Sequence, residues 1–274
     1  MELRAYLDRI GFIESPTINR STLNALMRAQ LQSISFENLD QQLGRPVSTD
    51  VSIIYSKIVE QHRGGWCFEL NGLFAWALTE IGFDVHTLAG HVSDDGSARA
   101  KPADHMALMV KCGEPLLVDV GFGGSMIEAV PLREITVRQA PYTISISHEV
   151  DGFLRFREEA DESQSSFDFR LTPVGSGYFD EISLSLQTNE DSPFRRTLTA
   201  QRRYENRHMV LRGRLLRTIS PEGRNELLLE TSDELVSCLR NEFGLEVPEI
   251  SDVWPRIMQR HSQLFGSANT GVRG

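Results

Sequence analysis

The chain has 274 residues, and its 38 acidic against 28 basic side chains give a net charge of −10. This balance argues against nucleic acid as the main partner, because nucleic-acid-binding surfaces are basic. No apolar run reaches the roughly 18 residues of a membrane span, and residues 1–4 lead into no signal-peptide core. Three widely spaced cysteines without a CxxC pair suggest neither disulfides nor a zinc site, so we expect a globular protein of the cytoplasm.

The first third of the chain predicts a bundle of four helices. Apolar residues recur there every three to four positions, as they do along one face of a helix. The fourth helix follows Gly64 and Gly65, is apolar nearly all round and stops at Gly82, so it should lie buried among the others. The expected helices cover residues 3–10, 23–34, 53–59 and 66–81.

The middle third changes to the pattern of β-strands. Short strands at this spacing suggest a small antiparallel barrel or a curled sheet. Asp151 and Gly152 form a residue pair typical of a two-residue hairpin turn, and the acidic stretch 158–166 is expected to be an exposed loop. The expected strands cover residues 85–92, 106–111, 115–122, 142–150 and 153–157.

The last third is mixed. Strands are expected at 207–219 and 225–230, followed by a helix that ends before Gly244 and a final helix at 251–265. Arginines between positions 202 and 217 form a local basic cluster. We interpret this cluster as a solvated face, although its charge also suits a phosphate.

Cys67 stands where the fourth helix is expected to start. Free backbone N–H groups and the positive end of the helix dipole favour thiolate over thiol at that position. A cysteine nucleophile needs this anionic form at neutral pH. The alternative is a buried core cysteine, because Cys67 also shares a helix face with Leu70 and Phe74.

His105 opens one expected strand, and Asp119 lies in the next, in an apolar run where an unpaired carboxylate is costly. A two-residue turn at Gly113 and Glu114 would pair 119 with 108 and separate the two side chains onto opposite faces. A three-residue turn with Gly113 left-handed pairs 119 with 107 and brings Asp119 diagonally next to His105. A Cys-His-Asp set therefore requires the odd-length turn. Taken singly, a surface histidine and a capping aspartate are the alternatives.

Three segments resemble, in order and spacing, the motifs of the arylamine N-acetyltransferase family. They are 36–40 (FENLD), 63–71 (RGGWCFELN) and 118–123 (VDVGFG). The likeness is close over residues 1–130 and weak beyond them. The chain departs from many relatives at Gln30 and Ser35, and the stretch before Phe194 looks shortened.

The resemblance implies an α+β fold with a core like that of the cysteine proteases. It implies an N-terminal helical bundle (1–83) carrying the nucleophile, a central antiparallel β-barrel (84–190) carrying the histidine and aspartate, and a C-terminal α/β lid (191–274). The residues that it assigns are catalytic Cys67, His105 and Asp119, acceptor-pocket Phe36 and Phe122, and CoA-binding Gly123 and Gly124, with no metal.

The implied reaction is a ping-pong transfer, as in xenobiotic metabolism. Cys67 takes acetyl from acetyl-CoA and passes it to an arylamine, arylhydroxylamine or hydrazine, while His105 relays protons. The alternatives are an amide synthase of a biosynthetic pathway, a cysteine hydrolase of the papain or transglutaminase kind, and a non-enzymatic binding protein. A metal site is disfavoured, because His86 and His91 would lie on opposite faces of one strand.

Overall fold

The computed structural model of the protein describes residues 1–123, 126–160 and 163–265. Its N-terminal helices pack around α5 (Cys67–Ile81), which is buried on all sides over its first turns and ends at Gly82 in the left-handed region (φ 107°). The other helices of this part are α1 (Leu3–Arg9), α2 (Arg20–Ser33), α3 (Leu39–Leu43) and α4 (Val51–Tyr55), which continues as a π-helix (Ser56–Glu60). The four predicted helices are confirmed, whereas no periodic pattern predicts the five-residue α3.

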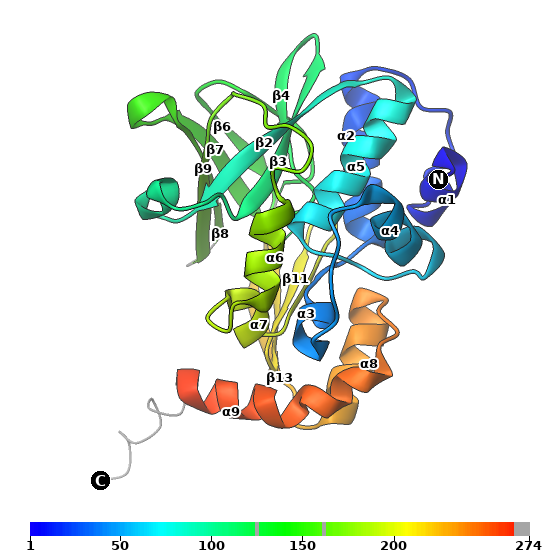
Figure 1. Cartoon of the computed structure of the whole chain (residues 1–274), viewed down its shortest axis with the longest axis vertical. Helices are drawn as coiled ribbons and strands as arrows, with labels where there is room; N and C mark the ends of the chain where they lie inside the picture. Colours follow the sequence, from blue (N-terminus) through cyan, green and yellow to red (C-terminus); the bar gives the residue numbers. More distant parts are fainter. Residues whose placement is uncertain (124–125, 161–162, 266–274) are drawn as a thin grey trace.

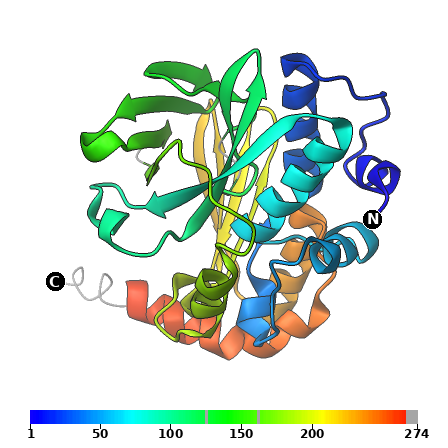
Figure 2. The same ribbon diagram turned by 45° about the horizontal axis from the view of Figure 1, so that its top comes forward.

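The middle of the chain forms an eight-stranded antiparallel sheet in the order β5-β4-β3-β2-β9-β8-β7-β6. The sheet curls into a nearly closed barrel beside the N-terminal helices, as Figure 1 and the turned view in Figure 2 show. Buried rings of Phe156, Phe167 and Phe169 pack against one another on β8 and β9. The strands are β2 (Asp84–Val92), β3 (His105–Cys112), β4 (Glu114–Val118), β5 (Val130–Pro131), β6 (Ile135–Gln139), β7 (Tyr142–His148), β8 (Leu154–Ala160) and β9 (Ser163–Phe169), with 3₁₀ turns at Ser97–Ala100 and Val150–Gly152.

The exposed loop predicted at 158–166 is wrong. Strands β8 and β9 pair along this stretch, from Leu154 opposite Phe169 to Ala160 opposite Ser163. The polar Glu158 and Ser166 side chains are buried, so hydrophobic alternation gives no sign of a strand here. A turn at Asp151 and Gly152 is confirmed, because both residues adopt positive φ angles. The predicted length of two residues is wrong, since His148 pairs with Leu154 and the Glu149 N–H donates to the Phe153 carbonyl, which leaves a loop of three residues.

A second, five-stranded sheet has the order β1-β10-β11-β12-β13. Its first strand, β1 (Phe36–Glu37), comes from the N-terminal part and pairs with β10. The strand predicted over 207–219 is in fact two, because Gly213 turns the chain between them (φ 61°). The remaining elements are α6 (Asp180–Thr188), α7 (Pro193–Arg196), β10 (Thr199–Arg203), β11 (His208–Arg212), β12 (Leu215–Ser220), β13 (Gly223–Leu228), α8 (Ser232–Phe243), a 3₁₀ turn (Pro248–Val253) and α9 (Trp254–Phe265).

Buried apolar side chains of the described residues form three clusters. One joins the N-terminal helices to the barrel, and another lies between the five-stranded sheet and α8. The third surrounds Cys67 and contains Trp66, Phe68, Ala103 and Phe179. Strand β1 belongs to the N-terminal part of the chain but pairs into the second sheet. The domain boundaries expected after residues 83 and 190 therefore stay predictions. Within the described residues, no helix combines the length and apolarity that crossing a membrane requires.

Buried charges close the N-terminal side of α5. The Lys57 ammonium lies 2.8 Å from Glu69 Oε1 and 2.7 Å from Asp40 Oδ2. The Arg63 guanidinium lies 2.8 Å from Glu37 Oε1 and 3.1 Å from Asp40 Oδ1. Burial raises the pKa of Glu69 to about 7 although Lys57 opposes this shift, so the ammonium is needed to keep the carboxylate charged.

We expect Lys57→Met to lower the free energy of unfolding by about 3–5 kcal/mol, because the buried Glu69 would lose its cation and Asp40 would keep only its arginine partners. Urea unfolding would measure the change. Arg4→Ala is the control, since it breaks only an exposed ion pair with Asp8 and should cost less than about 1 kcal/mol. Equal losses in the two variants would contradict a supporting role for the buried charges.

Candidate active site

Cys67 is the first residue of α5, and a hydrogen bond of the residue before it caps the start of this helix. The Trp66 N–H donates to Glu69 Oε2 (3.1 Å), which closes the end of the helix. The preceding chain runs so close to Ser35 that a Cβ on Gly64 would lie 2.2 Å from the Ser35 carbonyl oxygen, so only glycine fits. Cys67 is 3% exposed, and its sulfur lies in the first helical turn, as the sequence predicts.

The register of β3 and β4 is the odd-length one that brings His105 and Asp119 together. Leu108 pairs with Val118, and Gly113 turns the chain in the left-handed region (φ 80°), so the next step places 119 opposite 107. His105 Nε2 lies 2.6 Å from Asp119 Oδ2, and both side chains are buried. Strand β4 ends at Val118 rather than at 122, and Asp119 follows it directly.

Asp119 is held by two further donors. Its Oδ1 accepts hydrogen bonds from the Asn71 amide (2.8 Å) and from the Gly121 N–H (2.8 Å). A Cβ on Gly121 would lie 2.9 Å from Cys67 Cα, so this segment packs directly on the backbone of α5. Sequence reasoning misses the role of Asn71. The available signal is its position four residues after Cys67, which puts both side chains on one helix face.

The ring of His105 is cationic at neutral pH. Burial alone would lower its pKa, but the Asp119 carboxylate and hydrogen bonds to Asp119 and Cys67 outweigh burial and raise the pKa of His105 to about 10. Because Nε2 is bonded to Asp119, Nδ1 is the ring nitrogen left for the sulfur of Cys67. The structure thus brings all three predicted catalytic residues together.

The predicted pocket residues have different surroundings. Phe36 borders a cavity of about 450 Å³ between the five-stranded sheet and the barrel, together with Phe194. The ring of Phe122 instead packs edge-on against His105, with ring centres 5.0 Å apart. The backbone of Gly123 lies against the Gln201 side chain, and Gly124 lies outside the described residues.

The sequence does not predict a cluster of buried polar side chains near Asp119, which consists of Glu158, Tyr142, His208 and Arg203. Burial and the nearby charge of Asp119 raise the pKa of Glu158 well above its ordinary range. The Tyr142 hydroxyl hydrogen-bonds His208 Nδ1 (2.7 Å), while burial and the charge of Arg203 lower the pKa of His208 to about 3. The solvated face proposed for the basic cluster is wrong at Arg203, which is 1% exposed and donates to backbone carbonyls.

Metal-binding side chains do not gather in the part of the chain that the structure describes, since no three His, Cys, Asp or Glu residues are placed to share an ion. His86 Nε2 lies instead 2.9 Å from Asp84 Oδ1. What the site holds together is a cysteine, an imidazolium and a carboxylate. These groups have the chemistry of a nucleophile, a proton carrier and a group that orients the ring.

Comparison with known proteins identifies the class first. A protein-family model described as N-acetyltransferase matches residues 20–253. The arylamine N-acetyltransferase of Mycolicibacterium smegmatis is 31% identical over 280 residues, which cover 94% of this chain and 98% of that protein. The enzyme of Mycobacterium tuberculosis is 32% identical over 262 residues, which cover 92% of each chain.

Solved structures agree with these relatives. The Mycobacterium marinum arylamine N-acetyltransferase in complex with CoA has a TM-score of 0.84 and 30% identity, covering 96% of this chain and 99% of that one. The Mycobacterium smegmatis structure has a TM-score of 0.86 at 28% identity, covering 94% and 98%. The chain belongs to the arylamine N-acetyltransferase family, which confirms the predicted family and the α+β fold.

Alkylation by iodoacetamide at pH 7 should modify Cys67, because the cationic ring of His105 lies beside its sulfur at the start of a helix. Cys238 should stay unmodified, since burial raises the pKa of its thiol to about 12. His105→Asn should slow alkylation of Cys67 about 10-fold or more at pH 7. The advantage of the wild type should vanish as pH rises through about 10, where His105 loses its proton. Peptide mass mapping would measure the rates, and a pH-independent difference would contradict the ion pair.

Proposed function

We propose that this protein transfers the acetyl group of acetyl-CoA to an arylamine, arylhydroxylamine or hydrazine through an acetyl-cysteine at Cys67. The observation that carries the proposal is the buried hydrogen bond of 2.6 Å between His105 and Asp119 next to a cysteine that opens a helix. Family membership supports the substrate classes, since relatives are named arylamine N-acetyltransferases and one is solved with CoA.

In the first half-reaction, the thiolate of Cys67 attacks the carbonyl carbon of the thioester. A bond forms between this carbon and Sγ, and the bond to the sulfur of CoA breaks. The cationic ring of His105 donates its proton to the leaving thiolate. One thioester replaces another, so the step is nearly balanced in energy and suits a reversible carrier.

In the second half-reaction, the nitrogen of the amine attacks the acetyl group on Cys67. The ring of His105, now neutral, accepts the proton that the nitrogen loses, and the sulfur leaves as thiolate. Asp119 keeps the ring oriented and stabilises the cation that forms in each cycle. The low exposure of Cys67 and His105 favours an amine over water as the acceptor, because the acyl group is shielded from solvent.

Several finer assignments belong to the same proposal. Phe36 forms a wall of the acceptor pocket, and its place beside the cavity supports this role. Phe122 holds the other side through its packing on His105. Gly123 offers its backbone to CoA next to the cavity wall at Gln201, and Gly124, which lies outside the described residues, is assigned to the same role from its place in the sequence. The three-part division of the chain and a cytoplasmic location are proposed with them, the latter from three free cysteines.

Acetyl-CoA alone should add one acetyl group to the peptide that contains Cys67, and an arylamine should then remove it as the N-acetyl product. Mass spectrometry of the digested protein would follow both steps. Cys67→Ala should abolish labelling, whereas the control Cys112→Ala should keep it. An unlabelled Cys67 in folded protein refutes the proposal. Loss of the acetyl group at the same rate without amine identifies a hydrolase instead.

A further inference from the structure

A carboxyl group that the acetyl-transfer steps do not use faces the cavity that Phe36 borders. Glu158 lines this cavity of about 450 Å³ together with Phe36 and Phe194. The residue is 7% exposed, and its Oε2 atom has no hydrogen-bond partner among the residues that the structure describes. A buried carboxyl oxygen without a partner is costly, so this oxygen suits a hydrogen-bonding group that enters the cavity.

The polar side chains near Glu158 are engaged with other groups. The Tyr142 hydroxyl hydrogen-bonds His208 Nδ1 at 2.7 Å. The Arg203 guanidinium donates to the backbone carbonyl of Ala140. These contacts hold the neighbours of Glu158 in place and leave its Oε2 atom to a ligand.

A row of aromatic rings connects Glu158 to the catalytic histidine. The ring of Phe122 lies 5.0 Å from that of His105 and 5.9 Å from that of Phe156. Phe156 precedes Glu158 by two residues on β8, so both side chains project from one face of the strand, about 7 Å apart. Burial and the charge of Asp119 raise the pKa of Glu158 while the charge of His105 lowers it, so both catalytic residues lie close enough to act on it.

An aromatic acceptor has the length that this row requires. A benzene ring with an amine at one end and a carboxamide at the other spans roughly 6 Å by ordinary bond lengths. With the reacting nitrogen at Cys67 and the ring against Phe122 and Phe156, the opposite substituent extends along β8 toward Glu158.

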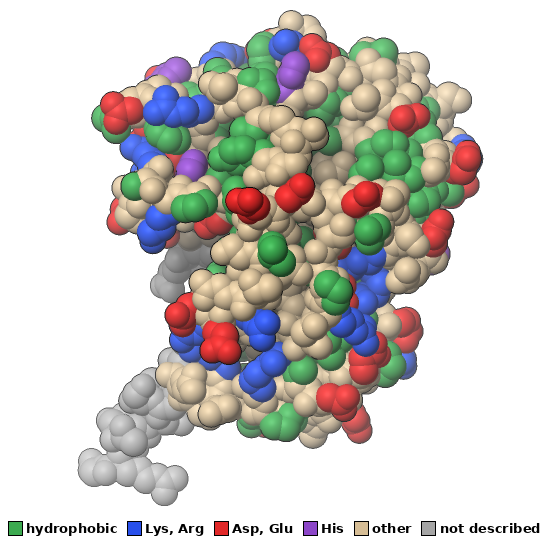
Figure 3. Space-filling view, in the orientation of Figure 1, with side chains coloured by type: hydrophobic (Ala, Val, Ile, Leu, Met, Phe, Trp, Pro, Cys, Tyr) green, Lys and Arg blue, Asp and Glu red, His purple; other side chains and the backbone are tan. Residues whose placement is uncertain are grey.

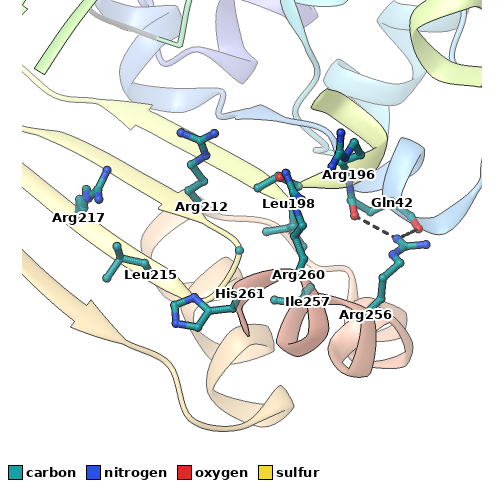
Figure 4. Close-up of a pocket in the computed structure, with 12 residues that line it drawn as sticks. Gln42, Arg196, Leu198, Arg212, Leu215, Arg217, Arg256, Ile257, Arg260 and His261 are labelled. Atoms are coloured by element: carbon teal, nitrogen blue, oxygen red, sulfur yellow. Dashed lines mark hydrogen bonds between the residues drawn. The ribbon is translucent and has the colours of Figure 1, made fainter. Parts of the chain in front are cut away.

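The charges around the cavity indicate the kind of substituent. Arg212 and Arg217 line the cavity from neighbouring strands of the five-stranded sheet (Figure 4), and Lys and Arg side chains gather on the outer surface where α7 faces α9 (Figure 3). An anionic group is drawn to these cations and is repelled by Asp119. A neutral group that both donates and accepts hydrogen bonds suits the carboxyl of Glu158 in either of its protonation states.

We propose that Glu158 recognises a neutral hydrogen-bonding substituent of the carboxamide class on the ring of the aromatic amine. This assignment rests on the proposed acetyl transfer and names a residue that determines which acceptors are used. The carboxyl group forms no bond with the reacting atoms, so it acts on the choice of acceptor. A site with a buried polar group discriminates strongly against analogues that leave this group unpaired.

Two acceptors of similar shape test this role: 4-aminobenzamide, and 4-isopropylaniline, which carries methyl groups in place of the amide oxygen and nitrogen. Glu158→Leu should lower the ratio of kcat/KM for 4-aminobenzamide to that for 4-isopropylaniline about 10-fold or more, because leucine cannot form hydrogen bonds. Glu158→Gln should keep the ratio within about 3-fold of wild type, because its amide both donates and accepts. Glu159→Leu is the matched control and should keep the wild-type ratio, since Glu159 is exposed on the other face of β8.

An unchanged ratio in Glu158→Leu, including equal losses on both acceptors, overturns the proposal. A ratio that falls as far in Glu158→Gln as in Glu158→Leu also overturns it, because hydrogen bonding is then not the cause. Should leucine prevent folding, Glu158→Asp withdraws the carboxyl by one methylene and should lower the ratio about 3-fold or more, and an unchanged ratio there counts equally against the proposal. Mass spectrometry of Cys67 after incubation with acetyl-CoA separates the two levels, since wild type that is not acetylated refutes the proposed function itself.

Discussion

Asp119 carries a carboxylate in the protein interior, where a charge is stable only when hydrogen-bond donors surround it. Its donors come from three parts of the chain: the ring of His105 on β3, the amide of Asn71 on α5 and the backbone N–H of Gly121. Packing that lost one of them would leave the charge under-solvated. The arrangement that satisfies Asp119 is therefore the one that brings the imidazole to the sulfur of Cys67.

Most residues of the sequence motifs around the site hold its parts in place. In the segment 36–40, Glu37 and Asp40 bind the cations that close the N-terminal side of α5. Phe36 bridges to Gly65 and also starts the five-stranded sheet, so one short strand joins the nucleophile's helix to the wall of the cleft. The same residues thus position the sulfur and border the space in which a substrate lies.

The sequence predicts well what depends on local chemistry. The spacing of apolar residues predicts the helices, Gly82 predicts where α5 ends, and Asp151 predicts a turn. Of the two turn lengths considered between β3 and β4, only one gives the register in which His105 contacts Asp119. Features that depend on distant partners are not readable in this way. Strand β1 is two residues long and exists because β10 pairs with it. The buried Ser166 and Asp168 of β9 depend on a hydrogen bond to Ser93 and on ion pairs with Arg99 and Arg155. The residues around Glu158 in the sequence are polar and acidic, so they predict an exposed loop and not a buried side chain.

Gly121 leaves no space between the segment after β4 and the start of α5, since an added methyl group would also lie 2.6 Å from the Asn71 amide nitrogen. Two backbones in direct contact cannot be moved apart or closer by exchanging side chains. The half of the site formed by Gly121 and the start of α5 is consequently rigid. The opposite wall is different, because Phe36 and Phe194 border a cavity and a change in their bulk alters its shape without touching Gly121 or α5.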